Sequence, residues 1–213
     1  MKSYDQIFLA NRAWAQTIKN VDEDYFKNLS LGQAPKYFWI GCADSRMAET
    51  VITRSQLGQF FVHRNVANVV VHTDFNCLTV LAYAIDVLKI EHVIVVGHYG
   101  CGGVRAAYES ADNGLIDNWL RNIKDVLHMH RSRFDVLPDD ESRVDLLCEL
   151  NVVSQVANVC HTTIAQNAWA RGQSLSVHGL VYSLHDGLLK DLQCSVTGLD
   201  QVSDVYRVIV PPG

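Results

Sequence analysis

Proline and glycine are scarce in this chain, which has 4 Pro and 13 Gly among 213 residues. Such a composition leaves no room for a long flexible linker, so we expect a single domain over residues 1–213. Basic residues are also few, because 18 Lys and Arg stand against 23 Asp and Glu, a formal charge of −5. Nucleic-acid binding depends on clustered Lys and Arg, so we expect no nucleic-acid partner.

Long apolar runs are missing as well. No stretch approaches the roughly 18–20 residues of a membrane span, and residues 1–6 lack the apolar core of a secretory signal. The six cysteines show no disulfide-framework spacing, which favours reduced thiols. We therefore expect a cytoplasmic protein with no membrane partner. The hydrophobic content of 48% is enough for a sizeable core.

Strand-like and helix-like patterns alternate along the chain. Strands are predicted at 37–41, 60–62, 92–97 and 174–182, the last one turning back at Asp186-Gly187. Helices are predicted near 3–18, 74–88, 104–110, 117–131 and 141–170. This alternation predicts the α/β class, with a mainly parallel central sheet flanked by helices and an antiparallel edge strand. Residues 1–30 are predicted to form an N-terminal helical arm whose apolar face packs on a partner subunit.

Metal-binding side chains fall in two short clusters, each directly after a predicted strand. Cys42 and Asp44 follow the first strand, and His98 and Cys101 follow the third. These residue types are the donors that Zn²⁺ accepts, and two thiolates favour zinc over cations that prefer oxygen. In parallel sheets ligands gather beyond the carboxyl ends of the strands. The sequence therefore predicts one zinc ion per chain, against the alternative that both cysteines are small buried apolar residues.

Asp44 and Arg46 leave two interpretations open when only their residue types are considered. One is a surface ion pair worth at most about 1 kcal/mol. The other is a functional pair in which Arg46 holds the carboxylate away from the metal and leaves the fourth position for water. In that case Asp44 is an exchangeable ligand, and its movement onto the zinc closes the site.

The pattern Cys42-x-Asp44-Ser45-Arg46 followed by His98-x-x-Cys101 resembles the signature of the β-class carbonic anhydrases. The similarity covers about residues 30–190, and its last matching motif residue is Tyr182. It implies a zinc lyase that interconverts CO₂ and bicarbonate, with Asp44 and Arg46 as the catalytic pair. It also implies homodimers or homotetramers joined through the N-terminal helices.

Two further features of the resemblance concern regulation. Trp39, Arg64 and Tyr182 match the residues that hold a second, non-catalytic bicarbonate in the allosteric type II subgroup, so the resemblance implies a bacterial enzyme of that subgroup. Arg64 supplies positive charge, while the Trp39 indole and the Tyr182 hydroxyl can donate hydrogen bonds to an anion. The alternative is an aromatic core cluster with a buried structural arginine. After Arg46 many members carry Val-Pro-Ala, whereas this chain has Met47-Ala48-Glu49.

Two other functions compete with carbonate dehydratase activity. Related proteins hydrolyse CS₂ or COS at the same zinc site, because both molecules resemble CO₂. A non-catalytic zinc module would instead have Cys42, Asp44, His98 and Cys101 closing the site permanently. The presence of Arg46 argues against that module, because a permanently bound Asp44 would not need a cationic competitor.

Overall fold

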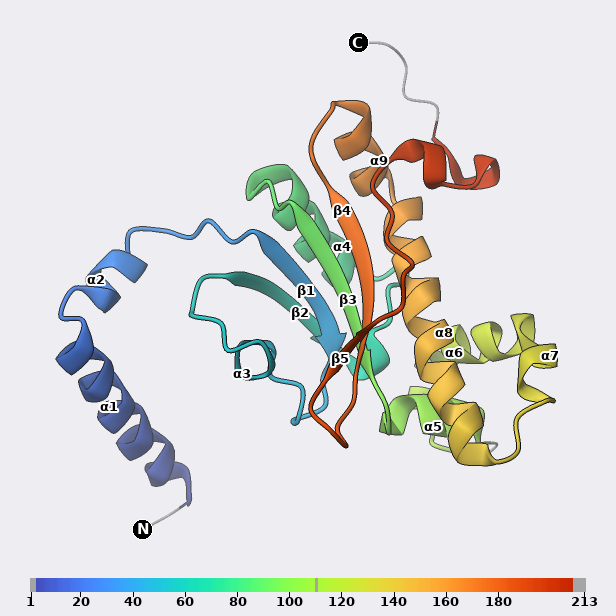
Figure 1. Cartoon of the computed structure of the whole chain (residues 1–213), viewed down its shortest axis with the longest axis horizontal. Coiled ribbons are helices and arrows are strands. Elements are labelled where there is room, and N and C mark those ends of the chain that lie inside the picture. The colour runs from blue at the N-terminus through green and yellow to red at the C-terminus, as the bar shows by residue number, and fades with distance from the viewer. Residues whose placement is uncertain (1–2, 110, 209–213) are drawn as a thin grey trace. The chain divides into compact units, whose positions relative to one another are not determined.

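Five strands form one sheet in the computed structural model, which describes residues 3–109 and 111–208. The strands are β1 (Tyr37–Cys42), β2 (Phe60–Asn65), β3 (His92–His98), β4 (Ser176–Tyr182) and β5 (Leu189–Asp191). Their order across the sheet is β2-β1-β3-β4-β5 (Figure 1). The first four strands are parallel to one another, and β5 runs antiparallel to β4. The predicted α/β class with an antiparallel edge strand is confirmed.

In sequence, α1 and α2 precede β1, and α3 to α9 lie between the successive parallel strands. They are α1 (Ser3–Val21), α2 (Tyr25–Leu29), α3 (Glu49–Ile52), α4 (Phe75–Ala82), α5 (Gly102–Tyr108), α6 (Ile116–Met129), α7 (Arg131–Phe134), α8 (Asp140–His161) and α9 (Thr163–Ala170). Short helical turns are η1 (Val66–Asn68), η2 (Tyr83–Val87), η3 (Leu199–Gln201) and η4 (Asp204–Tyr206). Across the described ranges, none of these helices combines the length and apolar character of a membrane span.

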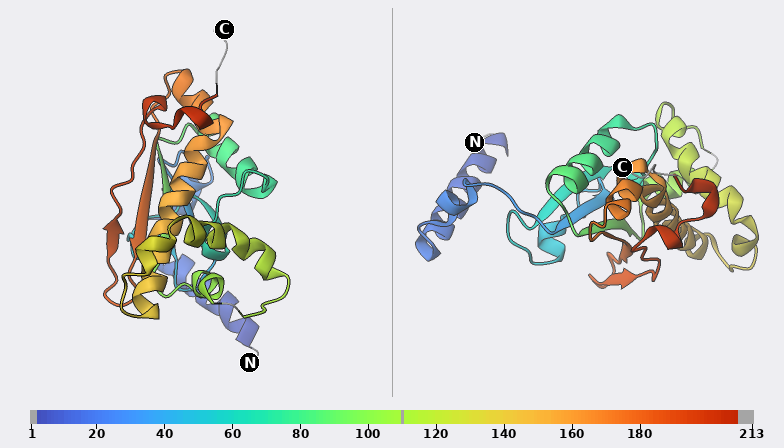
Figure 2. Two further views of the ribbon diagram at one scale, coloured as in Figure 1. Left: turned by 90° about the vertical axis from the view of Figure 1, so that its right-hand side faces the viewer. Right: turned by 90° about the horizontal axis from the view of Figure 1, so that it is seen from above.

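One of the two buried clusters, here called the main core, lies on the face of the sheet that α4, α8 and α9 cover. Successive side chains of a strand point to opposite faces, so alternate positions supply this core. They are Phe38, Ile40, Val93, Val95, Val177 and Val181, all buried against the helices. Helix α8 contacts both β3 and β4 and runs along the sheet, as Figure 2 shows from the side. The pairing of β1 with β3 fixes the two strands relative to each other and so places their carboxyl ends.

The helical pattern predicted at 141–170 is interrupted at Thr162. This residue is extended, with ψ 145°, and ends α8. Its hydroxyl accepts a hydrogen bond of 3.2 Å from the backbone N–H of Ala165, which caps α9. The prediction of one helix was wrong because the apolar stripe continues on both sides of the break and does not reveal it.

The N-terminal segment forms a unit of its own, because contacts divide the chain between Ala34 and Pro35. Helix α1 has no buried residue in this chain. Tyr4, Ile7 and Phe8 are each at least half exposed. Within the unit, Trp14 meets Phe26 of α2 edge-to-face with ring centroids 5.5 Å apart. The predicted helix at 3–18 is confirmed and extends to Val21.

Candidate metal centre

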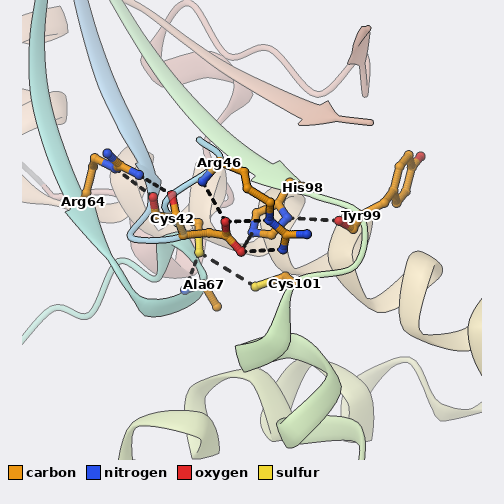
Figure 3. Close-up of polar contacts among 8 residues, drawn as sticks. Cys42, Arg46, Arg64, Ala67, His98, Tyr99 and Cys101 are labelled. Atoms are coloured by element: carbon orange, nitrogen blue, oxygen red, sulfur yellow. Dashed lines mark hydrogen bonds and ion pairs between the residues drawn. The ribbon is translucent and has the colours of Figure 1, made fainter. Parts of the chain in front are cut away.

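The two predicted clusters meet at one edge of the sheet. β1 and β3 are parallel neighbours, so their carboxyl ends lie side by side, with Cys42 ending β1 and His98 ending β3. The chain then turns back, and Cys101 lies directly before α5. The Sγ atoms of Cys42 and Cys101 are 3.9 Å apart, and the potential ligand atoms of all three residues lie within 4.8 Å of one another (Figure 3). Three donors from distant parts of the sequence thus share one small volume.

His98 presents an unpaired nitrogen to this cluster. The ring is 1% exposed, and its Nδ1 lies 3.0 Å from the carbonyl oxygen of Tyr99, so Nδ1 carries the proton and donates to that oxygen. Its Nε2 is buried and has no hydrogen-bond partner. A buried polar atom without a partner is costly. A cation next to Nε2 would remove this cost, so the residues present fit a metal ion.

The two thiols titrate as a pair. A hydrogen bond from Cys101 lowers the pKa of Cys42 to about 4, and His98 acts in the same direction. Burial alone would raise this pKa. The same hydrogen bond, together with burial, raises the pKa of Cys101. The pair therefore accepts one negative charge readily and a second only beside a cation. Two thiolates and one neutral imidazole form the donor set of a Zn²⁺ site that keeps a fourth position for water.

Asp44 is bound to Arg46 rather than to the cluster. Its Oδ1 accepts from the backbone N–H and from Nε of Arg46, both at 2.9 Å, and its Oδ2 accepts from Nη2 at 2.6 Å. Arg46 accordingly lowers the pKa of the Asp44 carboxyl well below its usual range. The nearest approach of the carboxylate to the ligand atoms is 3.8 Å, between Oδ2 and Nε2 of His98. The structure thus describes the paired form of Asp44 and not the form in which it is a ligand.

Two groups that support Cys42 come from Arg64 on β2 and from Ala67 in the turn that follows it. The backbone N–H of Ala67 donates to Cys42 Sγ at 3.4 Å. Nε of Arg64 donates to the carbonyl oxygen of Cys42 at 2.8 Å, and its Nη2 donates to the carbonyl oxygen of Asp44 (Figure 3). Anion binding and a structural role were both open for Arg64, and these hydrogen bonds are structural ones. Residue types could not predict the role of Ala67, because its donor is a backbone group.

A cavity of about 440 Å³ opens beside the exposed side of Arg46. Its lining includes Tyr99, Asp145, Ser183 and His185. Burial, reinforced by nearby Glu141, raises the pKa of Asp145. Because Arg46 lines the cavity, the cavity lies next to the Asp44–Arg46 ion pair.

Trp39, Arg64 and Tyr182 share the face of the sheet opposite the main core. Arg64 is the strand partner of Gly41, and a Cβ added at Gly41 would lie 2.3 Å from Nε1 of Trp39. The indole therefore covers Gly41, and its Nε1 is buried without an acceptor. Tyr182 lies on β4 as the strand partner of His98. The donors of Arg64 that are described above point to backbone carbonyls.

Comparison with known proteins bears on this site. The family model described as carbonic anhydrase matches residues 37–189. A carbonic anhydrase of Emericella nidulans is 41% identical over 207 residues, covering 97% of this chain and 90% of that protein. The structure of a Coccomyxa β-carbonic anhydrase in complex with acetazolamide is 39% identical, with a TM-score of 0.88 over 94% of this chain and 90% of that one.

A third relative is one of two tetrameric β-carbonic anhydrases from the ascomycete Sordaria macrospora. It is 36% identical with a TM-score of 0.87, and the alignment covers 92% of this chain and 99% of that one. The relatives from Emericella and Sordaria are fungal, so the bacterial origin expected from the sequence is not confirmed by them.

Proposed function

Because the chain belongs to the β-class carbonic anhydrase family, we propose that it catalyses the reversible hydration of CO₂ to bicarbonate and a proton at a zinc ion held by Cys42, His98 and Cys101. The observation that carries this proposal is the cluster of three buried donors within 4.8 Å, beside a carboxylate that Arg46 keeps away from it. The function rests on this chain's own site and on its membership of the family.

A zinc ion bound there would supply a Lewis acid that activates water near neutral pH. The chain's own residues do the rest. The Tyr99 carbonyl fixes the tautomer of His98 so that Nε2 is the ligand atom. The ionised Asp44 can only accept hydrogen bonds, so it would orient the reacting water by accepting a hydrogen bond from it at Oδ2. Arg46 holds that oxygen in place through a forked pair of hydrogen bonds.

The closed, non-catalytic module is disfavoured by the hydrogen bonds of Asp44. The carboxylate accepts from Arg46 three times, and a permanent ligand would give up these bonds. Hydrolysis of CS₂ or COS remains the second enzymatic candidate, because it would use the same donors.

Stopped-flow measurement of CO₂ hydration by the zinc-loaded protein, over about pH 6.5–9, tests the proposal. We expect turnover of CO₂ far above that of CS₂ or COS, and loss of activity in Cys42→Ala. Faster turnover of CS₂ or COS would assign the site to the alternative substrates. Absence of all three activities in protein that carries one zinc per chain would favour the closed module.

We further propose that the chain acts in the cytoplasm as a homodimer or homotetramer. The support is the exposed apolar surface of α1, which a second copy can cover. The tetrameric state of the Sordaria relatives agrees with this. Light scattering of the full chain beside a variant that begins at Pro35 should show a smaller assembly for the shortened protein. An equal number of chains per particle in both proteins would show that the arm does not form the interface.

Regulation by a second bicarbonate, as in the type II subgroup, is a separate proposal. Its support is the buried Nε1 of Trp39, which has no hydrogen-bond acceptor. The cationic Arg64 lies on the neighbouring strand, as the partner of Gly41. An anion held there by Trp39, Arg64 and Tyr182 would compete for the donors that Arg64 gives to Cys42 and Asp44 and so favour release of Asp44 from Arg46. We expect CO₂ hydration to rise above about pH 8 more steeply than one proton allows, and bicarbonate to inhibit at lower pH. A one-proton profile that bicarbonate and Trp39→Phe leave unchanged would rule the switch out.

A further inference from the structure

The turn that follows β2 has an unfavourable backbone conformation. Ala67 and Asn68 both have left-handed backbone angles, with φ 63° and φ 49°. Each costs a residue with a Cβ roughly 1–2 kcal/mol relative to the right-handed region. Both residues are at most 1% exposed. Such a conformation persists only where the surrounding structure holds it in place.

Two buried amides of α8 hold this turn. Nδ2 of Asn151 donates to the carbonyl oxygen of Ala67 at 2.9 Å. Nε2 of Gln155 donates to Oδ1 of Asn151 at 2.9 Å and so fixes its orientation, while Oε1 of Gln155 accepts from the backbone N–H of Val70 at 2.9 Å. Positions 151 and 155 are one helical turn apart and lie on the same face of α8. Each amide is 1% exposed.

The turn in turn determines what faces the candidate metal centre. The Ala67 N–H donates to Cys42 Sγ (Figure 3), and the carbonyl of the same residue accepts the hydrogen bond from Asn151. We infer that Asn151 and Gln155 are positioning residues, which direct the Ala67 N–H at Cys42 Sγ and thereby reduce the charge that this thiolate gives to the metal. The inference rests on the zinc site of the proposed function and adds two residues that touch neither metal nor substrate.

The chemistry gives the inference a spectroscopic consequence. A hydrogen bond to a metal-bound thiolate withdraws electron density from sulfur, and such outer contacts tune the metal. When Co²⁺ replaces Zn²⁺, the energy of the thiolate-to-cobalt charge transfer measures that density. Loss of the N–H donor makes the thiolate a stronger donor and moves the band to longer wavelength. A purely structural role for the amides predicts lower stability with no shift of the band.

The experiment compares Co²⁺-substituted full-length variants. Asn151→Leu removes the amide that grips Ala67 and keeps the branched shape of the side chain. Gln166→Leu is the matched control, because Gln166 is a fully buried amide whose partners include the carbonyl of Tyr206 in η4 and the N–H of Val208, both outside the turn that Asn151 holds. A third protein carries the α-hydroxy acid analogue of Ala67, which replaces the N–H by an ester oxygen and leaves the side chains intact.

We expect Asn151→Leu and the Ala67 analogue to shift the band to longer wavelength, with no shift in Gln166→Leu. A band unchanged in Asn151→Leu, or shifted equally in Gln166→Leu, overturns the inference. If Asn151→Leu does not fold, Gln155→Leu decides in the same way, because Gln155 fixes the orientation of Asn151. Absence of a thiolate band from the unsubstituted sequence contradicts the zinc site itself and thus the proposed function.

Discussion

Replacing Arg46 should separate catalysis from stability more clearly than any other change in this chain. Its side chain holds Asp44 with two hydrogen bonds, at 2.9 and 2.6 Å, yet is 55% exposed. Because solvent competes with exposed ion pairs, Arg46→Ala should leave the melting temperature close to that of the unsubstituted chain.

The effect on catalysis is expected to be larger. Without the guanidinium, the Asp44 carboxylate is free to leave its place 3.8 Å from Nε2 of His98 and to approach the metal. Loss of one orienting hydrogen bond to a charged group corresponds to about 1.5–3 kcal/mol, which is about 10- to 150-fold in kcat/KM. Arg46→Lys should recover only part of this loss, because the ammonium group keeps the positive charge but cannot form the forked pair of hydrogen bonds.

Stopped-flow CO₂ hydration, zinc content and thermal melting measure the three quantities on the same samples. Arg171→Ala is the matched control, since Arg171 forms a similarly exposed pair with Asp86 at 2.8 Å outside the candidate centre. The double variant with Asp44→Asn should lose little more than either single variant, because the two residues act as a unit. Wild-type activity in Arg46→Ala, or a loss matched by lost zinc, would refute this reasoning.

Three other predictions follow from the geometry. Removal of zinc by a chelator should lower the melting temperature, since a ligand at 100 times its Kd stabilises by about 2.7 kcal/mol. An unchanged melting temperature would show that the metal does not stabilise the fold. Gly41→Ala should destabilise by about 1–3 kcal/mol in urea unfolding, because its Cβ would lie 2.3 Å from Nε1 of Trp39; a neutral change would show that the indole moves freely. Burial, and then His92, lower the pKa of His178. Stability from this histidine is complete above its unfolded pKa of about 6.5 and is lost as pH falls through the lower folded pKa, so His178→Gln should flatten the acid limb of unfolding free energy against pH; an identical acid limb would contradict the assignment.

Residue pattern was sufficient to predict the strands that carry the site. The buried runs at 37–41 and 92–97 are continuous in sequence, and parallel pairing brings their ends together without further information. The residue pattern alone therefore predicts that Cys42, His98 and Cys101 lie in one cluster. The break at Thr162 could not be predicted, because capping decides it and the apolar stripe does not.

The support of the site was equally hidden from the sequence. The Ala67 N–H is a backbone group, and its direction depends on two left-handed residues that α8 holds from 84 positions away. The state of Asp44 is a choice between two partners of similar chemistry, Arg46 and a metal. Residue types alone permitted both, and only the geometry shows the carboxylate on Arg46.

X-ray absorption at the zinc K-edge of the purified protein tests the central claim most directly, namely that the carboxyl ends of β1 and β3 hold zinc through two thiolates and one imidazole. We predict one zinc per chain, with two sulfur neighbours at about 2.3 Å and nitrogen or oxygen neighbours at about 2.0 Å. Cys101→Ala should remove one sulfur neighbour or the metal altogether. A shell of nitrogen and oxygen alone, or protein that is active without zinc, would contradict the claim.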